Sequence, residues 1–371
     1  MPKKVLFLIP NLKHGGAEKV LVNLVNNLDP SKYDITVQTL FDLGVHREAL
    51  KPHVRYVPGL KGEIRGNSHI FKLFSPKMLF RHFVKEHYDT VISYLEGVTA
   101  RIVSGCTDPN TKKVCWIHTE FVSEKTAARG FRSIGEAREC YDRFDLIAAV
   151  SQRVCEQFEN HIGNNVPAAV LYNTNETEKI LELSAQAPEK NVFAPGIPHV
   201  CAIGRLGPVK GFDRLLNAHR RLLEEGINHR VLILGTGEDQ DKLTKTARQY
   251  GVEDSFVLLG FSSNPYQYLS KCDLFVCSSR REGFSTAVTE ALVLGVPVVS
   301  TDCSGARELL GEQDAFGIVT ENSEEGVYQG MKRMLSDPEL LAHYKVKAKE
   351  RGAFFSRTKT VQAVEDTLDR F

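Results

Sequence analysis

Two glutamates with seven residues between them mark the stretch whose spacing most directly suggests chemistry. Glu282 stands just before the predicted start of a helix, and Glu290 falls on the second turn of that helix. Ser285 or Thr286 is a plausible N-cap, so the backbone amides of residues 283–287 would gather at the helix N-terminus. Such a terminus favours an anion, above all a phosphate.

The two carboxylates themselves cannot usefully bind phosphate. We interpret Glu282 as an acceptor for the hydroxyls of a sugar ring and Glu290 as an acceptor for a ribose diol. A paired general acid and base, as in a hydrolase, is an alternative role. Two solvated surface glutamates are a second alternative, and this stretch alone does not decide between them. Nothing else in the sequence suggests a hydrolytic site.

Two cations stand on either side of a Gly-Pro turn. Arg205 and Lys210 follow the predicted strand at residues 199–204, so both side chains can face one point. Arginine offers a rigid fork and lysine a compact point charge, a pair that suits a diphosphate. The alternative is a solvated loop with two ordinary surface charges.

Glycines follow two other predicted strands. Gly15 and Gly16 precede a helix, where glycine lets the backbone approach a ligand closely, although a simple turn has the same pattern. The sequence Gly235-Thr236-Gly237 suggests a dinucleotide-binding loop. Gln240 occupies the position of the third glycine of that motif, so a dinucleotide oxidoreductase is disfavoured.

The elements that must position these residues are short apolar runs alternating with helical patterns. A length of 371 residues favours two domains. In the first half, helical stretches such as the one expected at residues 17–28 separate several of the strands. This alternation predicts a parallel sheet with helices on both faces. The strands expected there are residues 5–9, 35–39, 90–93, 113–117, 146–150 and 168–171.

The alternation stops near residue 174 and then restarts. Residues 173–198 are polar, contain three prolines and predict an interdomain connection with a short helix. We expect a first domain at 1–174, a linker at 175–197, a second domain at 198–352 and a final segment at 353–371 whose apolar helix face needs a partner. The strands expected in the second domain are residues 199–204, 230–234, 255–259, 274–277 and 296–300. Ligands of such sheets bind beyond the carboxyl ends of the strands.

Composition excludes several classes. With 42% apolar and 25% charged residues and a net charge of +1, the chain is an ordinary globular protein, and whole-chain nucleic-acid binding is disfavoured. Residues 5–9 follow two lysines as in a signal peptide, but the run is short and Pro10 ends it like a strand. No pair of the eight cysteines has Cys-x-x-Cys spacing, so we expect buried thiols in a reducing compartment and no zinc.

At these residues the chain resembles the retaining glycosyltransferases of family 4, which have the GT-B fold. That fold has two Rossmann-like, doubly wound parallel-sheet domains facing a cleft, with a C-terminal helix that crosses back to the first domain. The resemblance covers nearly the whole chain and is more specific in the second half. The motifs that carry it are Gly15-Gly16-Ala17-Glu18, Gly204-Arg205, Lys210-Gly211, Gly235-Thr236-Gly237, Glu282-Gly283-Phe284, Glu290-Ala291, Gly295-Val296-Pro297-Val298-Val299 and Gly305.

The resemblance implies a role for each matching residue. Gly16 lies near the donor phosphates, Glu282 contacts the donor sugar and Glu290 the ribose. His118 matches a histidine that lines the reaction centre, although a satisfied core histidine is the alternative. The implied catalytic residues are Arg205, Lys210, Glu282 and His118, and the implied donor-binding residues are Gly15, Gly16, Gly283, Phe284, Ser285, Thr286 and Glu290.

The resemblance also implies the chemistry. The donor is a nucleotide sugar, with UDP favoured by family frequency, and neither a metal nor another cofactor is needed because protein cations stabilise the leaving diphosphate. Asp239-Gln240-Asp241 is best interpreted as charges at a helix start. A non-catalytic nucleotide-sugar-binding subunit and a sugar-nucleotide epimerase of the same fold remain alternatives. One departure is Asn173-Thr174-Asn175-Glu176, where the family has Asn-Gly followed by an acid, and Glu96-Gly97 has no assigned role.

The acceptor side is less specific. Residues 51–85 hold eight Lys or Arg and one acid, Glu63, with aromatic residues interleaved in the latter half. Such a segment can lie on an anionic membrane, or it can be an ordinary amphipathic helix with a solvated basic side. With relatives that use lipid-linked acceptors, this favours a glycan acceptor on a lipid carrier and a cytoplasmic protein peripheral to the inner membrane face.

Overall fold

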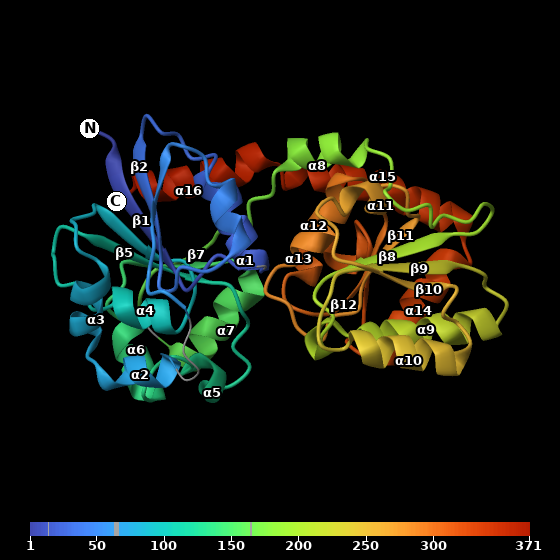
Figure 1. The fold of residues 1–371 in the computed structure, drawn as a ribbon, viewed down its shortest axis with the longest axis horizontal. Helices are drawn as coiled ribbons and strands as arrows, with labels where there is room; N and C mark the ends of the chain where they lie inside the picture. Colours follow the sequence, from blue (N-terminus) through green and yellow to red (C-terminus); the bar gives the residue numbers. More distant parts are fainter. Residues whose placement is uncertain (14, 63–66, 164) are drawn as a thin grey trace. The chain divides into compact units, whose positions relative to one another are not determined.

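The computed structural model describes residues 1–13, 15–62, 67–163 and 165–371. The chain forms two compact units (Figure 1). The first comprises Met1–Thr174 and Thr358–Phe371, and the second comprises Asn175–Arg357. The segment 175–197, expected as a linker, therefore begins the second unit and contains one short helix, α8 (Thr177–Ser184).

The first unit is built on a parallel sheet of seven strands in the order β3-β2-β1-β4-β5-β6-β7. The interior strand β1 is an uninterrupted apolar run that is buried from Val5 to Ile9, as expected where helices cover both faces. The strands are β1 (Lys3–Ile9), β2 (Tyr33–Thr39), β3 (Val54–Val57), β4 (Thr90–Ser93), β5 (Lys112–Ile117), β6 (Leu146–Ala149) and β7 (Ala168–Val170).

Helices lie on both sides of this sheet, with α1 and α16 on one side and α4 and α6 on the other (Figure 1). The helices of the unit are α1 (Gly16–Val25), η1 (Val45–Ala49), α2 (Asn67–Leu73), α3 (Pro76–Phe83), α4 (Val98–Val103), α5 (Glu124–Ala127), α6 (Ile134–Tyr141), α7 (Gln152–Ile162) and α16 (Arg357–Asp369).

The second unit repeats this plan with six parallel strands in the order β10-β9-β8-β11-β12-β13. The strands are β8 (His199–Ile203), β9 (Arg230–Leu234), β10 (Phe256–Gly260), β11 (Leu274–Cys277), β12 (Val298–Thr301) and β13 (Ile318–Thr320). Besides α8, the helices are η2 (Pro208–Lys210), α9 (Phe212–Glu224), α10 (Gln240–Tyr250), α11 (Tyr266–Leu269), α12 (Thr286–Val293), α13 (Ala306–Leu310), η3 (Glu312–Asp314), α14 (Glu324–Leu335) and α15 (Pro338–Phe354).

Two strands of the structure were not predicted, β3 and β13. Both are short and both lie at the edge of a sheet. In β3 the side chain of Arg55 is hydrogen-bonded to Thr36 and Glu86, so a charged residue interrupts the apolar pattern. An edge strand can lack a continuous apolar run, and in β3 the run that marks the predicted strands is missing.

The last helix packs on the first unit. Val361, Val364 and Leu368 are buried, and the Lys3 ammonium donates to the Leu368 carbonyl at 2.7 Å. The Glu365 carboxylate accepts from the Asp29 amide at 2.8 Å. The partner that this apolar face requires is therefore the first unit, and the expected fold class, two doubly wound parallel sheets with a C-terminal helix returning to the first, is confirmed.

Both sheets reverse their winding at an equivalent place. In the first sheet, β1 separates β2 from β4, and in the second, β8 separates β9 from β11. Loops that leave such a neighbouring pair diverge to opposite faces of the sheet, so a crevice opens at their carboxyl ends. The residues that follow β1 and β4, and those that follow β8 and β11, are therefore where ligand contacts are expected.

Candidate active site

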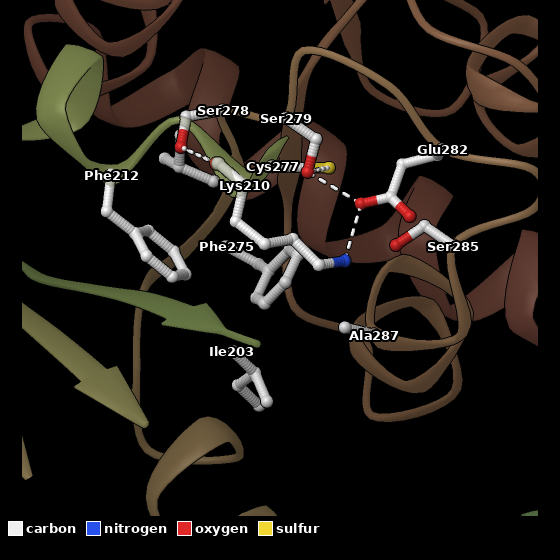
Figure 2. Close-up of a pocket in the computed structure, with 11 residues that line it drawn as sticks. Ile203, Lys210, Phe212, Phe275, Cys277, Ser278, Ser279, Glu282, Ser285 and Ala287 are labelled. Atoms are coloured by element: carbon white, nitrogen blue, oxygen red, sulfur yellow. Dashed lines mark hydrogen bonds and ion pairs between the residues drawn. The ribbon is translucent and has the colours of Figure 1, made fainter. Parts of the chain in front are cut away.

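The loops after β8 and β11 line a pocket in the second unit (Figure 2). The two strands are hydrogen-bonded neighbours, with Leu274 paired to Val200 and Phe275 to Cys201. The space between its lining atoms amounts to about 220 Å³, part of which is open to solvent. Its polar and charged lining consists of Lys210, Cys277, Ser278, Ser279, Glu282 and Ser285.

An ion pair between Lys210 and Glu282 lies at the centre of this lining. The Lys210 Nζ atom is 2.6 Å from Glu282 Oε1, and the side chains are 28% and 12% exposed. Ser279 Oγ donates to the same carboxylate oxygen at 2.6 Å (Figure 2). Burial lowers the pKa of Lys210, but the adjacent Glu282 carboxylate outweighs it and the pKa is raised above its ordinary value. The lysine is therefore a fixed cation at neutral pH.

A close approach of two loops holds Lys210 in place. Gly211 has φ +65°, and a Cβ atom there would lie 2.1 Å from the Ser278 carbonyl oxygen. Ser278 Oγ in turn donates to the Lys210 carbonyl at 2.9 Å. Only glycine combines this left-handed backbone with so near a neighbour, which explains the Lys210-Gly211 sequence.

The helix that follows Glu282 begins as predicted. Ser285 is the N-cap of α12, and its side chain accepts from the Val288 amide at 3.4 Å. Thr286 is the first helical residue and Gly283 lies in the preceding turn. Because Ser285 lines the pocket, the positive end of α12 is presented beside the Lys210–Glu282 pair.

The structure contradicts the interpretation of the two glutamates as solvated surface residues. Glu290 is only 3% exposed and accepts from the Tyr266 hydroxyl of α11 at 3.0 Å. Phe284 is buried as well and packs edge-on against Phe355, with ring centroids 5.6 Å apart. Any contact of Phe284 with a ligand would thus be made by its backbone.

Arg205 and Lys210 do not share a partner. The Arg205 side chain is 77% exposed, and its Nη2 atom lies 3.1 Å from Oε2 of Glu238. Glu238 belongs to the loop after β9 that begins Gly235-Thr236-Gly237. The structure therefore places the two cations in separate ion pairs, one exposed and one enclosed.

In the first unit the paired glycines adjoin α1. Gly15 is its N-cap in an extended conformation, and a Cβ atom there would lie 1.9 Å from Glu18 Oε2. A Cβ atom at Gly16 would have no neighbour within 4 Å among the described residues. Burial raises the pKa of Glu18. His14, the residue before this pair, lies outside the described residues.

His118 follows β5 and is 8% exposed. Its ring lies 4.7 Å from that of Tyr94 and 6.1 Å from that of Trp116. Within the described part of the chain, His118 Nε2, the Tyr94 hydroxyl and Trp116 Nε1 have no hydrogen-bond partner. Burial lowers the pKa of His118 to about 3. His118 is thus a neutral histidine, and at Nε2 it is not the satisfied core residue of the alternative interpretation.

Three polar residues at these sites were not singled out with a role. Ser279 and Tyr266 hold Glu282 and Glu290, and Glu96 accepts from the His118 amide at 2.9 Å. Ser279 and Glu96 each follow a strand end, which is the sequence signal that could have found them. No local pattern marks Tyr266, because its contact with Glu290 joins separate helices.

Across residues 1–13, 15–62, 67–163 and 165–371, no three His, Cys, Asp or Glu side chains are grouped so that they could hold a metal ion. Asp239 is the N-cap of α10 and Asp241 lies in its first turn, where both charges favour the helix. In the same residues, no helix is long and apolar enough to cross a membrane.

Two family models match the chain. Glycosyl transferases group 1 matches residues 184–351, and Glycosyltransferase Family 4 matches residues 14–179. Together they account for most of both units. The first match spans Lys210, Glu282 and Glu290, and the second spans His118.

The chain is similar to curated enzymes. It is 35% identical over 223 residues to a Campylobacter jejuni N-acetylgalactosamine-N,N'-diacetylbacillosaminyl-diphospho-undecaprenol 4-alpha-N-acetylgalactosaminyltransferase, covering 59% of this chain and 58% of that protein. It is 22% identical over 371 residues to the amylovoran biosynthesis glycosyltransferase AmsD of Erwinia amylovora, covering 99% of each. The match to the first relative thus spans little more than half of that protein's length.

Among solved structures, the chain is similar to Anabaena Alr3699/HepE. The complex with UDP has a TM-score of 0.78 at 20% identity and covers 99% of this chain and 100% of that chain. The same protein has been solved with UDP-glucose. The likeness identifies the fold as GT-B. With both units matched by their models, the chain belongs to glycosyltransferase family 4.

Proposed function

We propose that this protein is a retaining glycosyltransferase that moves a hexosyl unit from a nucleotide sugar to a glycan acceptor. The observation that carries the proposal is the enclosed Lys210–Glu282 pair beside the capped start of α12. A fixed cation and a helix N-terminus stabilise a departing diphosphate, and a carboxylate accepts from sugar hydroxyls.

In this proposal each residue contacts a different part of the donor. Lys210 binds the diphosphate, while Ser279 holds Glu282 so that its second oxygen accepts from the donor sugar. Glu290, supported by Tyr266, accepts from the ribose. Arg205 exchanges Glu238 for the diphosphate when the donor binds, because its exposed side chain is free to reorient. The remaining donor contacts are made by Gly15, Gly16, Gly283, Phe284, Ser285 and Thr286.

The reaction proceeds on one face of the sugar. The bond from the anomeric carbon to the phosphate oxygen breaks as the acceptor oxygen approaches the same face, and the departing oxygen takes the acceptor's proton. Glu282 is then no nucleophile. His118 lines the reaction centre as a neutral side chain, since its lowered pKa leaves it without charge at neutral pH. No metal is required, because Lys210 and Arg205 stabilise the leaving group.

The ligands and activities of similar proteins support the proposed donor and acceptor. UDP and UDP-glucose are bound in the solved structures of Alr3699/HepE, which favours UDP as the nucleotide. The Campylobacter relative acts on a diphospho-undecaprenol-linked glycan, and the Erwinia relative functions in amylovoran biosynthesis. We therefore propose a lipid-linked acceptor and a role in polysaccharide or glycoconjugate assembly.

An exposed surface on α2 and α3 supports association with an anionic membrane. Phe71, Leu79 and Phe83 pack into the first unit, whereas Leu73 is 77% exposed and Met78 is 58% exposed. Four basic residues accompany this apolar surface, namely Lys72, Lys77, Arg81 and Lys85. Residues 63–66 of the basic segment, Glu63 among them, lie outside the described residues.

Two buried or anchored arginines hold this surface in place. Arg101, which is 1% exposed, donates to the carbonyls of Phe71 and Phe74 at 2.9 and 2.8 Å and pairs with Glu136. Arg132 donates to the carbonyl of Lys72. Cations at the carboxyl end of α2 satisfy its free carbonyls and favour its dipole. The exposed apolar side chains are therefore displayed on a fixed element, at the inner face of the membrane in our proposal.

Liposome sedimentation tests the membrane assignment. Wild-type protein should sediment with anionic vesicles and be released by salt, because each basic residue near the surface contributes about 1 kcal/mol. Replacing Lys72, Lys77, Arg81 and Lys85 with glutamine should abolish sedimentation. A control with equal charge loss replaces the exposed Lys242, Lys245, Arg248 and Lys271. Wild-type protein that stays in the supernatant at low salt would show that the surface is only a solvated face.

Mass detection of products tests the enzymatic assignment. Sugar nucleotides are first screened by thermal shift, since a ligand at about a hundred times its Kd adds about 2.7 kcal/mol of apparent stability. The bound donor is then incubated alone and with glycan acceptors, with and without a chelator. Transfer only with acceptor, unaffected by the chelator, supports the proposal. A changed sugar without acceptor would indicate an epimerase, and binding without turnover a non-catalytic subunit.

A further inference from the structure

Glu96 and Gly97 directly follow β4 and have no part in the proposed donor contacts. β4 lies next to β1, where the winding of the first sheet reverses. The register of β4 and β5 pairs Ser93 with Cys115. Continued along both strands, this register places Glu96 opposite His118. A hydrogen bond agrees with that placement, because Glu96 Oε2 accepts from the His118 amide at 2.9 Å.

The Glu96 carboxylate binds two consecutive residues of the turn after β5. Besides the His118 amide at Oε2, it accepts from the Thr119 hydroxyl through Oε1 at 2.5 Å. Hydrogen bonds to an ionised carboxylate are roughly twice as strong as those between neutral groups. One side chain thus fixes both the backbone and a side chain of this turn.

The turn that carries Glu96 is itself closely packed. Gly97 has φ +82°, and a Cβ atom there would lie 2.8 Å from the Arg129 carbonyl oxygen. On the other side of Glu96, the Leu95 carbonyl accepts from the Thr99 hydroxyl at 2.8 Å. Glycine alone tolerates this positive φ with so near a neighbour, which explains why Gly97 follows Glu96. The carboxylate is therefore presented from a fixed backbone.

His118 depends on this support for its position. Its ring is buried with those of Tyr94 and Trp116, and its centroid lies 4.7 and 6.1 Å from theirs. In the part of the chain that the structure describes, no hydrogen bond at Nε2 orients the His118 ring. The packing of the three rings and the backbone held by Glu96 therefore place it.

We propose that Glu96 is a positioning residue, which holds the turn after β5 and thereby fixes His118 for the transfer reaction. The inference rests on the proposed function, in which His118 lines the reaction centre. Without Glu96, the His118 amide and the Thr119 hydroxyl lose their acceptor, and the ring can shift or admit water. Because a displacement of about 1 Å can cost about a hundredfold in rate, we expect Glu96→Ala to lower kcat by about tenfold to a hundredfold.

A conservative variant separates this role from a simple charge effect. An acid before the start of α4 is also favoured by the helix dipole, and that role needs only the charge. In Glu96→Gln the amide oxygen can still accept from the His118 amide, and the amide nitrogen can donate to the Thr119 hydroxyl. We therefore expect Glu96→Gln to retain most of the turnover. Thr119→Val, which removes one of the two contacts, should lower turnover less than Glu96→Ala.

The structural part is measured by nitrogen NMR of histidine-labelled full-length protein at pH 6, with the His118 signals assigned by their loss in His118→Gln. Wild type should show the ring-nitrogen shifts of a neutral histidine, because burial lowers the pKa of His118 to about 3. In Glu96→Ala the ring should gain access to water and show the averaged shifts of a partly protonated histidine. Glu96→Gln should resemble wild type.

The functional part is measured by steady-state kinetics with the donor and acceptor found in the product screen, and by calorimetry with UDP. The kcat of Glu96→Ala should fall while UDP affinity stays unchanged, because the proposed UDP contacts Lys210 and Glu290 belong to the second unit. The matched control is Glu86→Ala. Glu86 precedes β4, is 56% exposed and pairs with Arg55, so its loss should change neither the His118 spectrum nor turnover.

Each outcome decides one part of the proposal. Neutral-histidine shifts that persist in folded Glu96→Ala overturn it. Should Glu96→Ala not fold, Thr119→Val takes its place, and wild-type spectra together with wild-type turnover in that variant overturn it. A displaced ring with unchanged turnover, or a Glu96→Gln variant as impaired as Glu96→Ala, rejects the positioning role in catalysis. Wild-type protein without transferase activity contradicts the proposed function, while the His118 spectra still show whether Glu96 fixes the ring.

Discussion

The carboxyl edges of the two sheets have the same topology, but their polar side chains differ in whether they have hydrogen-bond partners. In the second unit, Lys210, Ser279 and Glu282 are already joined by hydrogen bonds of 2.6 Å. In the first unit, Tyr94, Trp116 and His118 place three polar atoms in a buried cluster without partners among the described residues. The same topology thus presents a completed charge network in one unit and unmet hydrogen-bonding capacity in the other.

The difference indicates which kind of ligand each sheet edge is suited to bind. A preformed ion pair costs little reorganisation when a charged ligand replaces one partner, which suits a diphosphate. Unpaired buried polar groups cost free energy until a hydroxyl or water satisfies them, which suits a neutral, hydroxyl-rich molecule.

Removing the enclosed cation should have the largest effect. Lys210→Ala is expected to lower turnover by at least roughly a hundredfold, on the scale of losing one preorganised electrostatic group. Arg205→Ala should do the same if Arg205 leaves Glu238 for the diphosphate. Steady-state kinetics with the donor identified by thermal shift measures both.

The control for these variants is Arg333→Ala. Arg333 is an exposed arginine of α14, and it forms an ion pair with Asp314 of η3. It should leave turnover unchanged. Near-normal turnover in folded Lys210→Ala would remove the diphosphate assignment and with it the contrast between the two edges. Normal turnover in Arg205→Ala alone would confine the assignment to the enclosed pair.

Variants of the two glutamates should separate nucleotide binding from sugar binding at the edge of the second sheet. Glu290→Gln should weaken binding of both UDP and the sugar donor by about 1.5–3 kcal/mol, because a charge-assisted hydrogen bond becomes a neutral one. Glu282→Gln should reduce sugar-donor binding and rate but leave UDP binding almost unchanged. Calorimetry with each ligand measures the split, and Tyr266→Phe reports how much depends on the support of Glu290. Equal losses of UDP affinity in both glutamate variants would contradict the division.

The smallest expected effect is on the pH dependence of stability, and it comes from two buried histidines, one in each unit. Burial lowers the pKa of both His118 and His219 to about 3 from 6.5, and His229 adds to the shift at His219. Between these values the unfolded chain binds more protons than the folded one, so the free energy of unfolding falls as pH falls below about 6.5. Each group should contribute a loss of about 2 kcal/mol by pH 5.

Denaturant unfolding at pH 7 and pH 5 checks this for wild type, His118→Gln and His219→Gln. Each variant should show a smaller loss on acidification. At pH 7, His219→Gln should be the more destabilising, since His219 bonds to His229 at 2.8 Å and Ser255 at 2.9 Å whereas His118 Nε2 has no partner among the described residues. An unchanged acid loss in His118→Gln would show that this edge is not held neutral by burial.

Much of the fold could be predicted from local pattern. Strands buried on both faces are continuous apolar runs, so β4, β9 and β11 begin and end where expected. The cap at Ser285 was also predictable, because an N-cap depends on residues only three positions away. The edge strand β3, in which Arg55 interrupts the apolar run, lacks that pattern and was missed.

The sequence by itself determined the two-unit α/β architecture, the family and the residue types available at the strand ends. Only the tertiary structure decided which of those side chains meet. Arg205 pairs with Glu238 from the loop after β9, while Lys210 pairs with Glu282 from the loop after β11. Burial of Glu290 under Tyr266 joins two separate helices. Such pairings depend on strand order and on how loops cross the sheet edge, whereas periodicity and capping report only on neighbours along the chain.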